Sequence, residues 1–258
     1  MTVAVATPVR VKAALSWWPA WLLLALFLCA LFAPWLAPMD PDRQNLLARL
    51  KAPGFESHGA VYLLGSDELG RDVLTRVIYG ARVSISVAVL SVLLSGVVGI
   101  AIGMAAGYLR GWTETVLMRL VDIFLSIPAI LLAIITVAVL GPGFINVILV
   151  LALTRWPRYA RVAYGQTLAI ADRPFVTLSR AMGAMPPRVL LLHILPNIVG
   201  PLLVVATLEF GLMVLFEAGL SFLGLGVQPP TASWGAMLST GRNYIATAWW
   251  IATFPGLA

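Results

Sequence analysis

Long uncharged stretches alternate with short charged segments along the whole chain. The first stretch covers residues 13–39 and the second covers residues 83–109. A membrane-spanning helix needs about 20 mostly apolar residues, so each stretch predicts one span. We place the first helix over roughly residues 17–36, after Arg10 and Lys12. A cleaved signal peptide has a shorter apolar region of about 7–15 residues, so we expect this helix to be retained.

A polar segment, residues 40–82, separates these two spans. Asp40-Pro41-Asp42 and Pro53-Gly54 predict loops in its first part. From Asp72 onwards, its apolar residues fall on one helical face. The segment is therefore expected to end in a short helix that lies along the membrane surface before the next span.

The uncharged segment 123–154 predicts a hairpin of two spans. Gly141-Pro142-Gly143 interrupts it, and one helix is not expected to continue through these residues. Two spans need about 40 residues, so their ends must include neighbouring arginines, which can extend to the lipid head groups. Pro128 is expected to kink the first of the two helices.

Two further apolar runs complete the pattern. One predicts a span over about residues 197–220, and the other begins near Tyr244 and stops at residue 258, which is too short for a normal span. The expected fold class is therefore an all-α integral membrane protein with about six transmembrane helices, the sixth incomplete. Its segments are 1–39, with the first helix, the outer loop 40–82, and a core over 83–258.

Composition supports a membrane protein. Of the 258 residues, 60% are hydrophobic and 11% are charged, whereas soluble domains carry about 25% charged residues. A soluble enzyme and a disordered chain are thereby excluded. The single cysteine, Cys29, leaves no internal disulfide. The net charge of +6 is explained by positively charged cytoplasmic loops rather than by binding to nucleic acid.

Four glycines recur along the second predicted span at spacings of three, four and four residues. They are Gly96, Gly99, Gly103 and Gly107. This spacing places them on one helical face, where small residues let two backbones approach closely. We interpret the face as a structural packing groove, and a groove that contacts a ligand is the alternative.

Residues 155–188 carry six arginines and one acidic residue, Asp172. Because positive residues concentrate in cytoplasmic loops, we expect this segment and the N-terminus inside the cell, and residues 40–82 outside. The part over about residues 165–195 predicts two short helical pieces, with a break at Gly183 and a stop at Pro196. Apolar helices on a water-facing loop indicate docking to a soluble partner, and a helix lying on the bilayer is the alternative.

The sequence lacks the motifs of nucleotide hydrolysis and of zinc chemistry. Both lysines, Lys12 and Lys51, are followed by alanine, whereas a P-loop needs Gly-Lys-Ser/Thr. His58 and His193 stand alone, without the ligand spacing of a zinc site. No enzymatic activity, metal or cofactor is therefore expected on this chain.

Several motifs together resemble the permeases of binding-protein-dependent ABC importers, most closely the dipeptide/oligopeptide/nickel branch. They occur in the family's order, and the N-terminal helix with its outer loop resembles the extra segment of the second permease subunit of dipeptide transporters. The motifs are Gly65-Ser-Asp-Glu-Leu-Gly-Arg-Asp72, Gly103-Met-Ala-Ala-Gly-Tyr108, Asp122 with Pro128, Arg180-Ala-Met-Gly-Ala184, His193-Ile-Leu-Pro-Asn197, Glu217-Ala-Gly-Leu-Ser-Phe-Leu-Gly-Leu-Gly226 and Gln228-Pro-Pro230.

The resemblance implies a type I ABC importer permease in the cell (inner or plasma) membrane. The chain would line a pore with a second, homologous permease subunit. Two ATPase subunits or domains, which would carry ATP and Mg, would receive the helix of the arginine-rich loop. An extracytoplasmic binding protein would deliver the substrate, for which dipeptides or short peptides are expected, while longer peptides, nickel chelates and haem remain open.

The resemblance also implies a set of coupling residues. They are Phe175, Thr177, Leu178, Arg180, Ala181, Met182, Gly183, Arg188 and His193. The family usually has Glu-Ala-Ala where this chain has Thr177-Leu178-Ser179, so any salt bridge made by that glutamate is lost. We therefore expect docking through packing, with Val176 and the apolar members of the set in a cleft of the ATPase and Arg180 at its rim.

Two carboxylates fall in or near the fifth predicted span. Because a carboxylate in hydrocarbon is costly, Glu209 and Glu217 are expected at a translocation path or a subunit interface. Glu217 most simply makes a hydrogen bond at the helix end. Glu209 either attracts a peptide's ammonium group or pairs with a neighbouring subunit. Asp122 most simply pairs with Arg119.

A different class of function uses the same carboxylates. In a self-contained secondary transporter or channel, Glu209 and Glu217 would be ion or proton sites. The hydropathy pattern shows no inverted repeat of the kind such transporters carry, and the docking loop would have no role. We therefore keep this function as the alternative.

Overall fold

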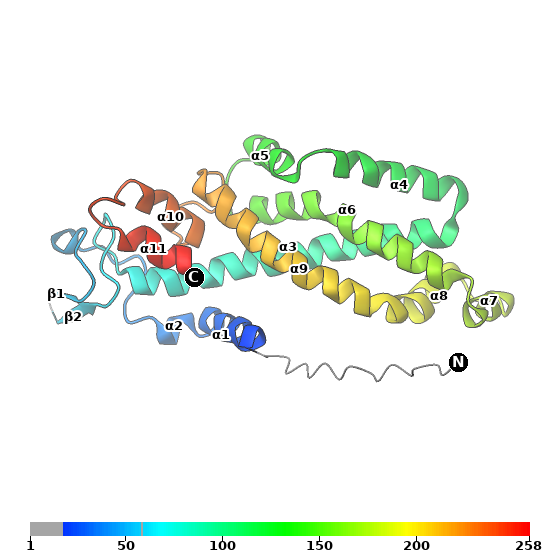
Figure 1. Ribbon diagram of the computed structural model, residues 1–258, viewed down its shortest axis with the longest axis horizontal. Helices are drawn as coiled ribbons and strands as arrows, with labels where there is room; N and C mark the ends of the chain where they lie inside the picture. Colours follow the sequence, from blue (N-terminus) through cyan, green and yellow to red (C-terminus); the bar gives the residue numbers. More distant parts are fainter. Residues whose placement is uncertain (1–17, 58) are drawn as a thin grey trace, which may run out of the picture.

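In the computed structural model of the chain, which describes residues 18–57 and 59–258, one long helix organises an elongated bundle (Figure 1). This helix, α3, spans Val73–Leu109. Helices α6 (Phe144–Ala171) and α9 (Leu195–Phe222) pack along it, and α1 (Trp18–Leu31) and α2 (Ala33–Leu36) contact its first half. Arg10, Lys12, His58 and the expected helix start at residue 17 lie outside the described residues.

The break predicted within residues 123–154 is confirmed, and the helical region before it is itself divided in two. Helix α4 (Gly111–Ser126) and helix α5 (Ala129–Leu140) meet at an angle of 90°. Pro128 therefore separates two helices instead of kinking one. The cause is local, since Ile127 precedes a proline and takes an extended conformation (φ −91°, ψ 128°). The predicted break at Gly141–Gly143 separates α5 from α6.

The separate surface helix predicted at the end of residues 40–82 is wrong. Helix α3 begins at Val73 and continues without interruption to Leu109. The Oδ2 atom of Asp72 caps its first turn by accepting hydrogen bonds from the backbone N–H (2.8 Å) and the hydroxyl (2.7 Å) of Thr75. Burial raises the pKa of Asp72, and the two bonds from Thr75 oppose that rise. Since no proline follows Asp72 before residue 109, nothing ends the helix at the expected boundary.

The arginine-rich loop is shorter than the sequence predicts. Helix α6 continues to Ala171, so the first three arginines of the segment are helical and the loop begins at Asp172. The prediction that Pro196 stops the second helical piece is wrong. Helix α8 (Pro186–Val189), the π-helical turn Leu190–Ile194 and α9 follow one another as a single helical segment, Pro186–Phe222, and Pro196 lies just after the π-helical turn.

Two helical segments of the described residues are long and apolar enough to cross a bilayer, Val73–Leu109 and Pro186–Phe222. Helices α4 and α5 would form a third span if they are taken together. The expectation of six spans is thus not confirmed. Helix α6 is long enough, but three arginines lie near its middle, and the last apolar run forms only the short helix α11 (Trp250–Leu257).

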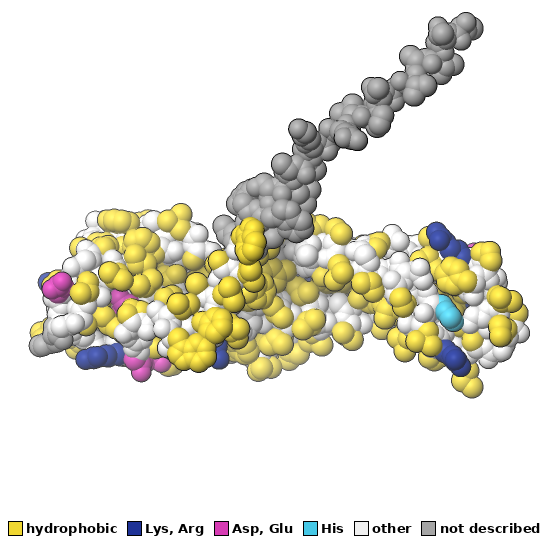
Figure 2. All heavy atoms as spheres, turned by 90° about the horizontal axis from the view of Figure 1, so that it is seen from below, with side chains coloured by type: hydrophobic (Ala, Val, Ile, Leu, Met, Phe, Trp, Pro, Cys, Tyr) yellow, Lys and Arg dark blue, Asp and Glu magenta, His cyan; other side chains and the backbone are white. Residues whose placement is uncertain are grey.

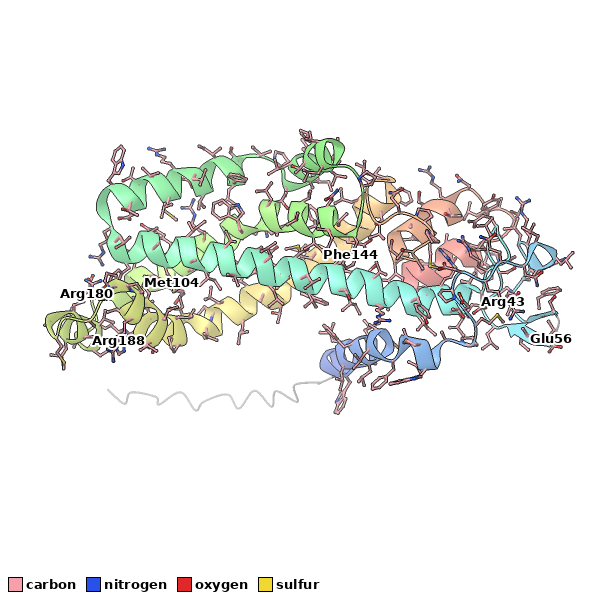
Figure 3. The ribbon with its side chains drawn as sticks, turned by 180° about the vertical axis from the view of Figure 1, so that it is seen from behind. Arg43, Glu56, Met104, Phe144, Arg180 and Arg188 are labelled. Atoms are coloured by element: carbon pink, nitrogen blue, oxygen red, sulfur yellow. The ribbon has the colours of Figure 1, made fainter. Side chains whose placement is uncertain are left out.

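Loops and short elements gather at the two ends of the bundle. One end holds residues 40–72, with a 3₁₀ turn (Leu46–Ala48) and a two-stranded hairpin, together with α10 (Trp234–Arg242) and α11. The other end holds α7 (Pro174–Ala181) and α8. Figure 3 shows Arg43 and Glu56 at the first end and Arg180 and Arg188 at the second. Hydrophobic side chains cover much of the surface between them (Figure 2).

The two strands of the hairpin are the exception to an all-α fold. Strand β1 (Phe55–Ser57) pairs antiparallel with β2 (Ala60–Tyr62), and Phe55 lies opposite Tyr62. The hairpin lies at the same end of the molecule as α10 and α11, outside the bundle of long helices.

The glycine face of α3 is packed against α6. A Cβ atom on Gly99 would lie 2.3 Å from the carbonyl oxygen of Trp156, and one on Gly103 would lie 2.3 Å from that of Ala160. A Cβ atom on Gly107 would lie 2.9 Å from the Cβ of Thr167. At Gly96 the nearest atom, on Tyr159, is 3.6 Å away, an ordinary contact. We call this contact the glycine seam; three of the four glycines are needed there because the two backbones touch.

Candidate functional site

The first candidate region is the elbow, which we define as residues 172–189. Helix α7 begins with Pro174 and is followed by Gly183, which has a φ of +82°. This left-handed conformation suits glycine and lets the chain turn back into α8. The turn is closed by backbone hydrogen bonds from Gly183 to Arg180 (2.9 Å) and from Ala184 to Ser179 (3.1 Å).

The elbow exposes apolar side chains at the end of the bundle. Met182 is 80% exposed, and Phe175, Leu178 and Met185 are exposed as well. Val176, in contrast, is fully buried. It belongs to the chain's own core with Val189 and Ile194, so the expectation that Val176 enters a partner's cleft is wrong. Its position in α7 places it on the inner face, where the helix packs against the bundle.

Two contacts fix the elbow to the end of α3. The guanidinium carbon of Arg180 lies 4.1 Å from the ring centre of Tyr108, a cation–π contact. Arg110 donates a hydrogen bond of 2.6 Å to Asp172, and this bond raises the pKa of the arginine. Arg180 therefore braces the elbow from within the chain, where the sequence predicts a contact at the rim of a partner.

The remaining coupling residues lie on the same end of the molecule. Ala181 and Arg188 are exposed, and His193 is half-buried. The hydroxyl of Thr177 donates to the carbonyl of Pro174 in its own helix (3.0 Å). The backbone carbonyl of His193 accepts a hydrogen bond from the side chain of Asn197 (2.7 Å).

The second candidate region is a charged cluster halfway along the bundle. Glu209 lies 14 residues after the start of α9, and Arg158 lies 14 residues after the start of α6. Arg158 Nη1 donates to Glu209 Oε1 at 3.2 Å, and Arg155 Nη1 lies 3.5 Å from Glu209 Oε2. Arg155 also lies over the ring of Phe216, 3.9 Å from its centre. We call Arg155, Arg158 and Glu209 the charged triad.

The members of the triad differ in their access to the surface. The side chains of Arg155 and Glu209 are 2% and 3% exposed, whereas that of Arg158 is 52% exposed. Arg158 and Glu209 open onto an apolar groove of about 740 Å³ between α4, α6 and α9. The other residues that line this groove are Leu125, Arg161, Val162, Val205, Leu208, Gly211, Leu212 and Leu215.

Asp122 does not pair with Arg119 as the sequence predicts. Its carboxylate accepts a hydrogen bond from Arg161, across from α4 to α6. Both side chains are about half exposed. The bend at Pro128 and the course of α4 alongside α6 bring the two together, and neither feature is visible in the spacing of Asp122 and Arg119.

Glu217 lies inside the chain, away from the groove. It is fully buried, and its carboxylate accepts hydrogen bonds from Ser84 on α3 and from Ser221 on α9, both of 2.7 Å. Ser221 in turn accepts a bond of 3.3 Å from the backbone N–H of Val227. Glu217 therefore joins α3 to the end of α9 through neutral donors.

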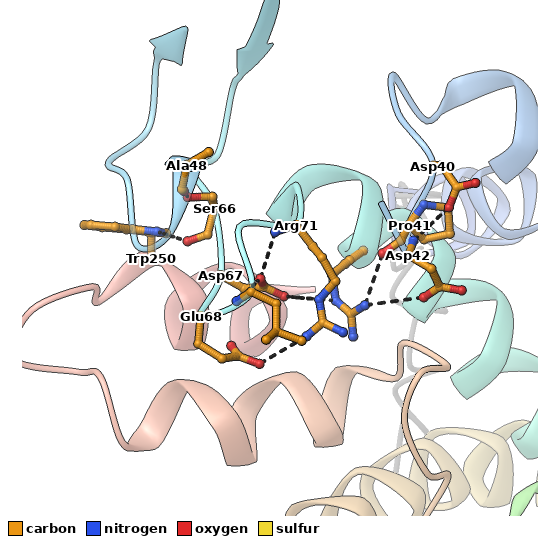
Figure 4. A network of polar contacts seen from close by, with 11 residues as sticks. Asp40, Pro41, Asp42, Ala48, Ser66, Asp67, Glu68, Arg71 and Trp250 are labelled. Atoms are coloured by element: carbon orange, nitrogen blue, oxygen red, sulfur yellow. Dashed lines mark hydrogen bonds and ion pairs between the residues drawn. The ribbon is translucent and has the colours of Figure 1, made fainter. Parts of the chain in front are cut away.

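A third polar cluster lies at the opposite end of the bundle from the elbow (Figure 4). Asp67 Oδ2 accepts from Arg71 Nε at 2.6 Å and lies 3.6 Å from Arg76 Nε. Arg71 also donates to Glu68 (3.1 Å), and Arg76 donates to the carbonyl of Pro41 (3.2 Å). Burial raises the pKa of Glu68, and the charge of Asp67 raises it further. The cluster ties the outer loop to the first turn of α3.

No contact in a candidate site was predicted from the sequence for Arg155, Arg158 or Tyr108. A signal for the two arginines exists, because an acid such as Glu209 inside an apolar helix requires a cation from another segment. Tyr108 gives no such signal, since only the fold places it under Arg180. Among the described residues there is no group of three or more His, Cys, Asp or Glu side chains that could hold a metal ion.

Comparison with known families agrees with the helical arrangement. Residues 99–258 match the family described as "Binding-protein-dependent transport system inner membrane component", and residues 15–53 match the "N-terminal TM domain of oligopeptide transport permease C". The first match covers more than half of the chain.

Curated relatives are similar over nearly the whole chain. The di/tripeptide transport system permease protein DppC of Pseudomonas aeruginosa is 45% identical over 236 residues, which cover 91% of this chain and 78% of the relative. The dipeptide transport system permease protein DppC of Escherichia coli K12 is 43% identical, with 92% and 79% covered. The probable D,D-dipeptide permease DdpC of the same strain is 39% identical, with 92% and 78% covered.

Among solved structures, the chain is similar in fold to the MetNI methionine ABC transporter in an inward-facing conformation. The TM-score is 0.55 at 22% sequence identity, and the match covers 72% of this chain and 87% of that chain. A second crystal form of the same transporter gives a TM-score of 0.57 at 21% identity, with 71% and 88% covered. These likenesses concern the fold alone.

Proposed function

Because this chain belongs to the family of binding-protein-dependent transport system inner membrane components, we propose that it is the permease subunit of an ATP-driven importer of dipeptides or short peptides. The family consists of membrane permease subunits that are not themselves catalytic. The cargo is inferred from the peptide permeases named among its relatives. The chain pairs with a second, homologous permease, and substrate reaches it from an extracytoplasmic binding protein.

The observation that carries a transport function is the half-exposed charge in the middle of the bundle. Arg158 lies about 20 Å from either end of α6 at 1.5 Å per residue. A charged side chain at that depth is costly in contact with lipid, so such residues face a watery cavity or a partner. The groove beside Arg158 is therefore the side of the chain that faces the pore or the second permease.

The elbow supplies the second element of the proposal. Its exposed methionines and leucine form an apolar surface at one end of the bundle, where a soluble ATPase reaches it from the cytoplasm. Aromatic residues and methionine are enriched in the buried cores of protein interfaces. With this end in the cytoplasm, residues 40–72 lie outside the cell. A self-contained transporter gives the elbow no partner.

Transport by this chain is expected to depend on ATP hydrolysis by the partner. The test is peptide uptake into proteoliposomes that hold this chain, the second permease and both ATPases, with the binding protein and ATP added. Replacing the P-loop lysine of the ATPases should abolish uptake, because that lysine contacts the β- and γ-phosphates. Uptake that continues at the normal rate would contradict the ABC mechanism.

Cysteines placed on the elbow are expected to cross-link to the ATPase. Leu178→Cys and Met182→Cys, each in a Cys29→Ser background, carry exposed side chains on α7 and directly after it. Leu47→Cys is the matched control, since Leu47 is 76% exposed at the opposite end of the bundle. Cross-links from the control alone, in a complex that transports peptide, would place the ATPase elsewhere.

A further inference from the structure

We propose that Arg158 binds the terminal carboxylate of the transported peptide in the groove between α4, α6 and α9. This inference rests on the proposed function and names the group that recognises its substrate. It starts from the net positive charge of the charged triad, which no other described residue neutralises.

The charge of the groove is the first step of the argument. Arg155 and Arg158 face the single carboxylate of Glu209, which leaves an excess of one positive charge. The other charged residue of the groove, Arg161, is already paired with Asp122. A cation in surroundings of low polarity requires an anion, so the groove is complementary to a carboxylate.

The hydrogen bonds of Arg158 are the second step. Within the described residues, its only side-chain hydrogen bond is the one from Nη1 to Glu209, although a guanidinium has five N–H donors. The side chain is half-exposed to the groove. Arg158 can therefore present a pair of parallel N–H groups to a carboxylate, the bidentate geometry in which arginine binds carboxylates most strongly.

Arg155 allows Arg158 to change partner. Glu209 Oε2 and Arg155 Nε are buried and make no hydrogen bond with any described residue, yet Arg155 Nη1 is already 3.5 Å from that oxygen. When a peptide carboxylate binds Arg158 in place of Glu209, Glu209 remains next to the positive charge of Arg155. No buried carboxylate is left unpaired during the exchange, which would otherwise oppose binding.

The shape of the groove fits a short peptide. Its volume of about 740 Å³ lies within the range of about 300–1,000 Å³ that is usual for small-molecule sites. Apart from the charged residues, its walls are aliphatic side chains of α4, α6 and α9, which suit apolar peptide side chains. Polar groups that converge at one place in an apolar groove fix the orientation of a ligand, and here they fix its carboxylate end.

The experiment compares a dipeptide with its C-terminal amide. Proteoliposomes that hold the complete complex take up each compound, supplied on saturating amounts of the loaded binding protein. The readout is the ratio of the two maximal uptake rates. Variants Arg158→Gln and Arg158→Lys are compared with the wild type, and Arg119→Gln is the matched control, an exposed arginine of α4 outside the groove lining. Every variant uses the same binding protein, so the binding protein's own preference cancels when the ratio of a variant is divided by that of the wild type.

We expect the wild type to favour the free acid by about tenfold or more, the strength of a charge-assisted hydrogen bond. Arg158→Gln should lower the ratio towards one, Arg158→Lys should keep part of it because lysine lacks the planar fork, and Arg119→Gln should leave it unchanged. An unchanged ratio in Arg158→Gln would overturn the inference.

Other outcomes separate this inference from the proposed function. A wild-type complex that imports neither compound contradicts the function itself. A wild type that imports both compounds equally contradicts only the role of Arg158. If Arg158→Gln prevents assembly with the second permease while Arg158→Lys assembles and keeps the wild-type ratio, an acidic residue of that permease occupies Arg158, and the inference is again overturned.

Discussion

The Gly103→Leu variant is expected to lose nearly all folded protein. A Cβ atom at Gly103 would lie 2.3 Å from the carbonyl oxygen of Ala160 and 2.8 Å from the Cβ of Ala163, so the added side chain must push α3 away from α6. These two helices have the most extensive contact of any pair of elements in the described residues. Pushing them apart would also separate the neighbouring glycines of the seam from α6. Overpacking costs about 1–3 kcal/mol and occasionally more, and a clash with the backbone of the neighbouring helix places this variant at the upper end.

The measurement is the yield and thermal unfolding temperature of the purified chain. Gly165→Leu is the matched control, because Gly165 lies on α6 with no atom within 4 Å of its added Cβ. Gly96→Ala should also be tolerated, since its Cβ would make an ordinary contact of 3.6 Å. Normal yield and stability of Gly103→Leu would show that α3 and α6 do not form the seam in the membrane.

The Glu209→Leu variant is expected to be the second severely destabilised protein. It leaves Arg155, which is 2% exposed, without its anion. Breaking a buried ion pair by removing one partner costs about 3–5 kcal/mol, whereas an apolar replacement of both partners is often neutral. The double variant Glu209→Leu/Arg155→Met should therefore regain most of the lost stability.

The wild type, Glu209→Leu, Arg155→Met and the double variant are compared by thermal unfolding in the same detergent. Asp122→Leu serves as the control, since it breaks an ion pair whose side chains are about half exposed and should cost at most about 1 kcal/mol. Equal losses in the single and double variants would mean that Arg155 does not depend on Glu209. In that case the triad is not a unit.

The parts of the fold that depend on the lengths of the apolar segments could be predicted from the sequence. The span after residue 83, the break at Gly141–Gly143 and the span near residues 197–220 agree with the structure. The glycine spacing also indicated a packing face, because a four-residue repeat returns to the same side of a helix. The spacing does not identify the helix that packs against this face, which is α6.

The errors at Arg155 and Asp122 share one cause, the pairing of charges that lie far apart in the sequence. Counting positive residues assigned Arg155 to a loop, because a count does not show which arginines have an anion. Arg155 and Glu209 are separated by more than 50 residues and meet only when α6 and α9 pack together. The pairing of Asp122 depends in the same way on α4 lying beside α6. Proline was misread for a local reason, since its effect depends on its position within a helix.

The unbroken course of α3 has a mechanical consequence. Its 37 residues extend over about 55 Å at 1.5 Å per residue. Sharp bends in helices arise at prolines, at Gly/Ser pairs and at disturbed turns; α3 has no proline between Val73 and Leu109, and it continues as one helix through Ser95-Gly96. Its first turn is tied to the outer loop through Arg76, and its last turn is held under Arg180. Because α3 runs unbroken between these two ties, we expect a tilt imposed at the elbow to move residues 40–72 at the opposite end of the bundle.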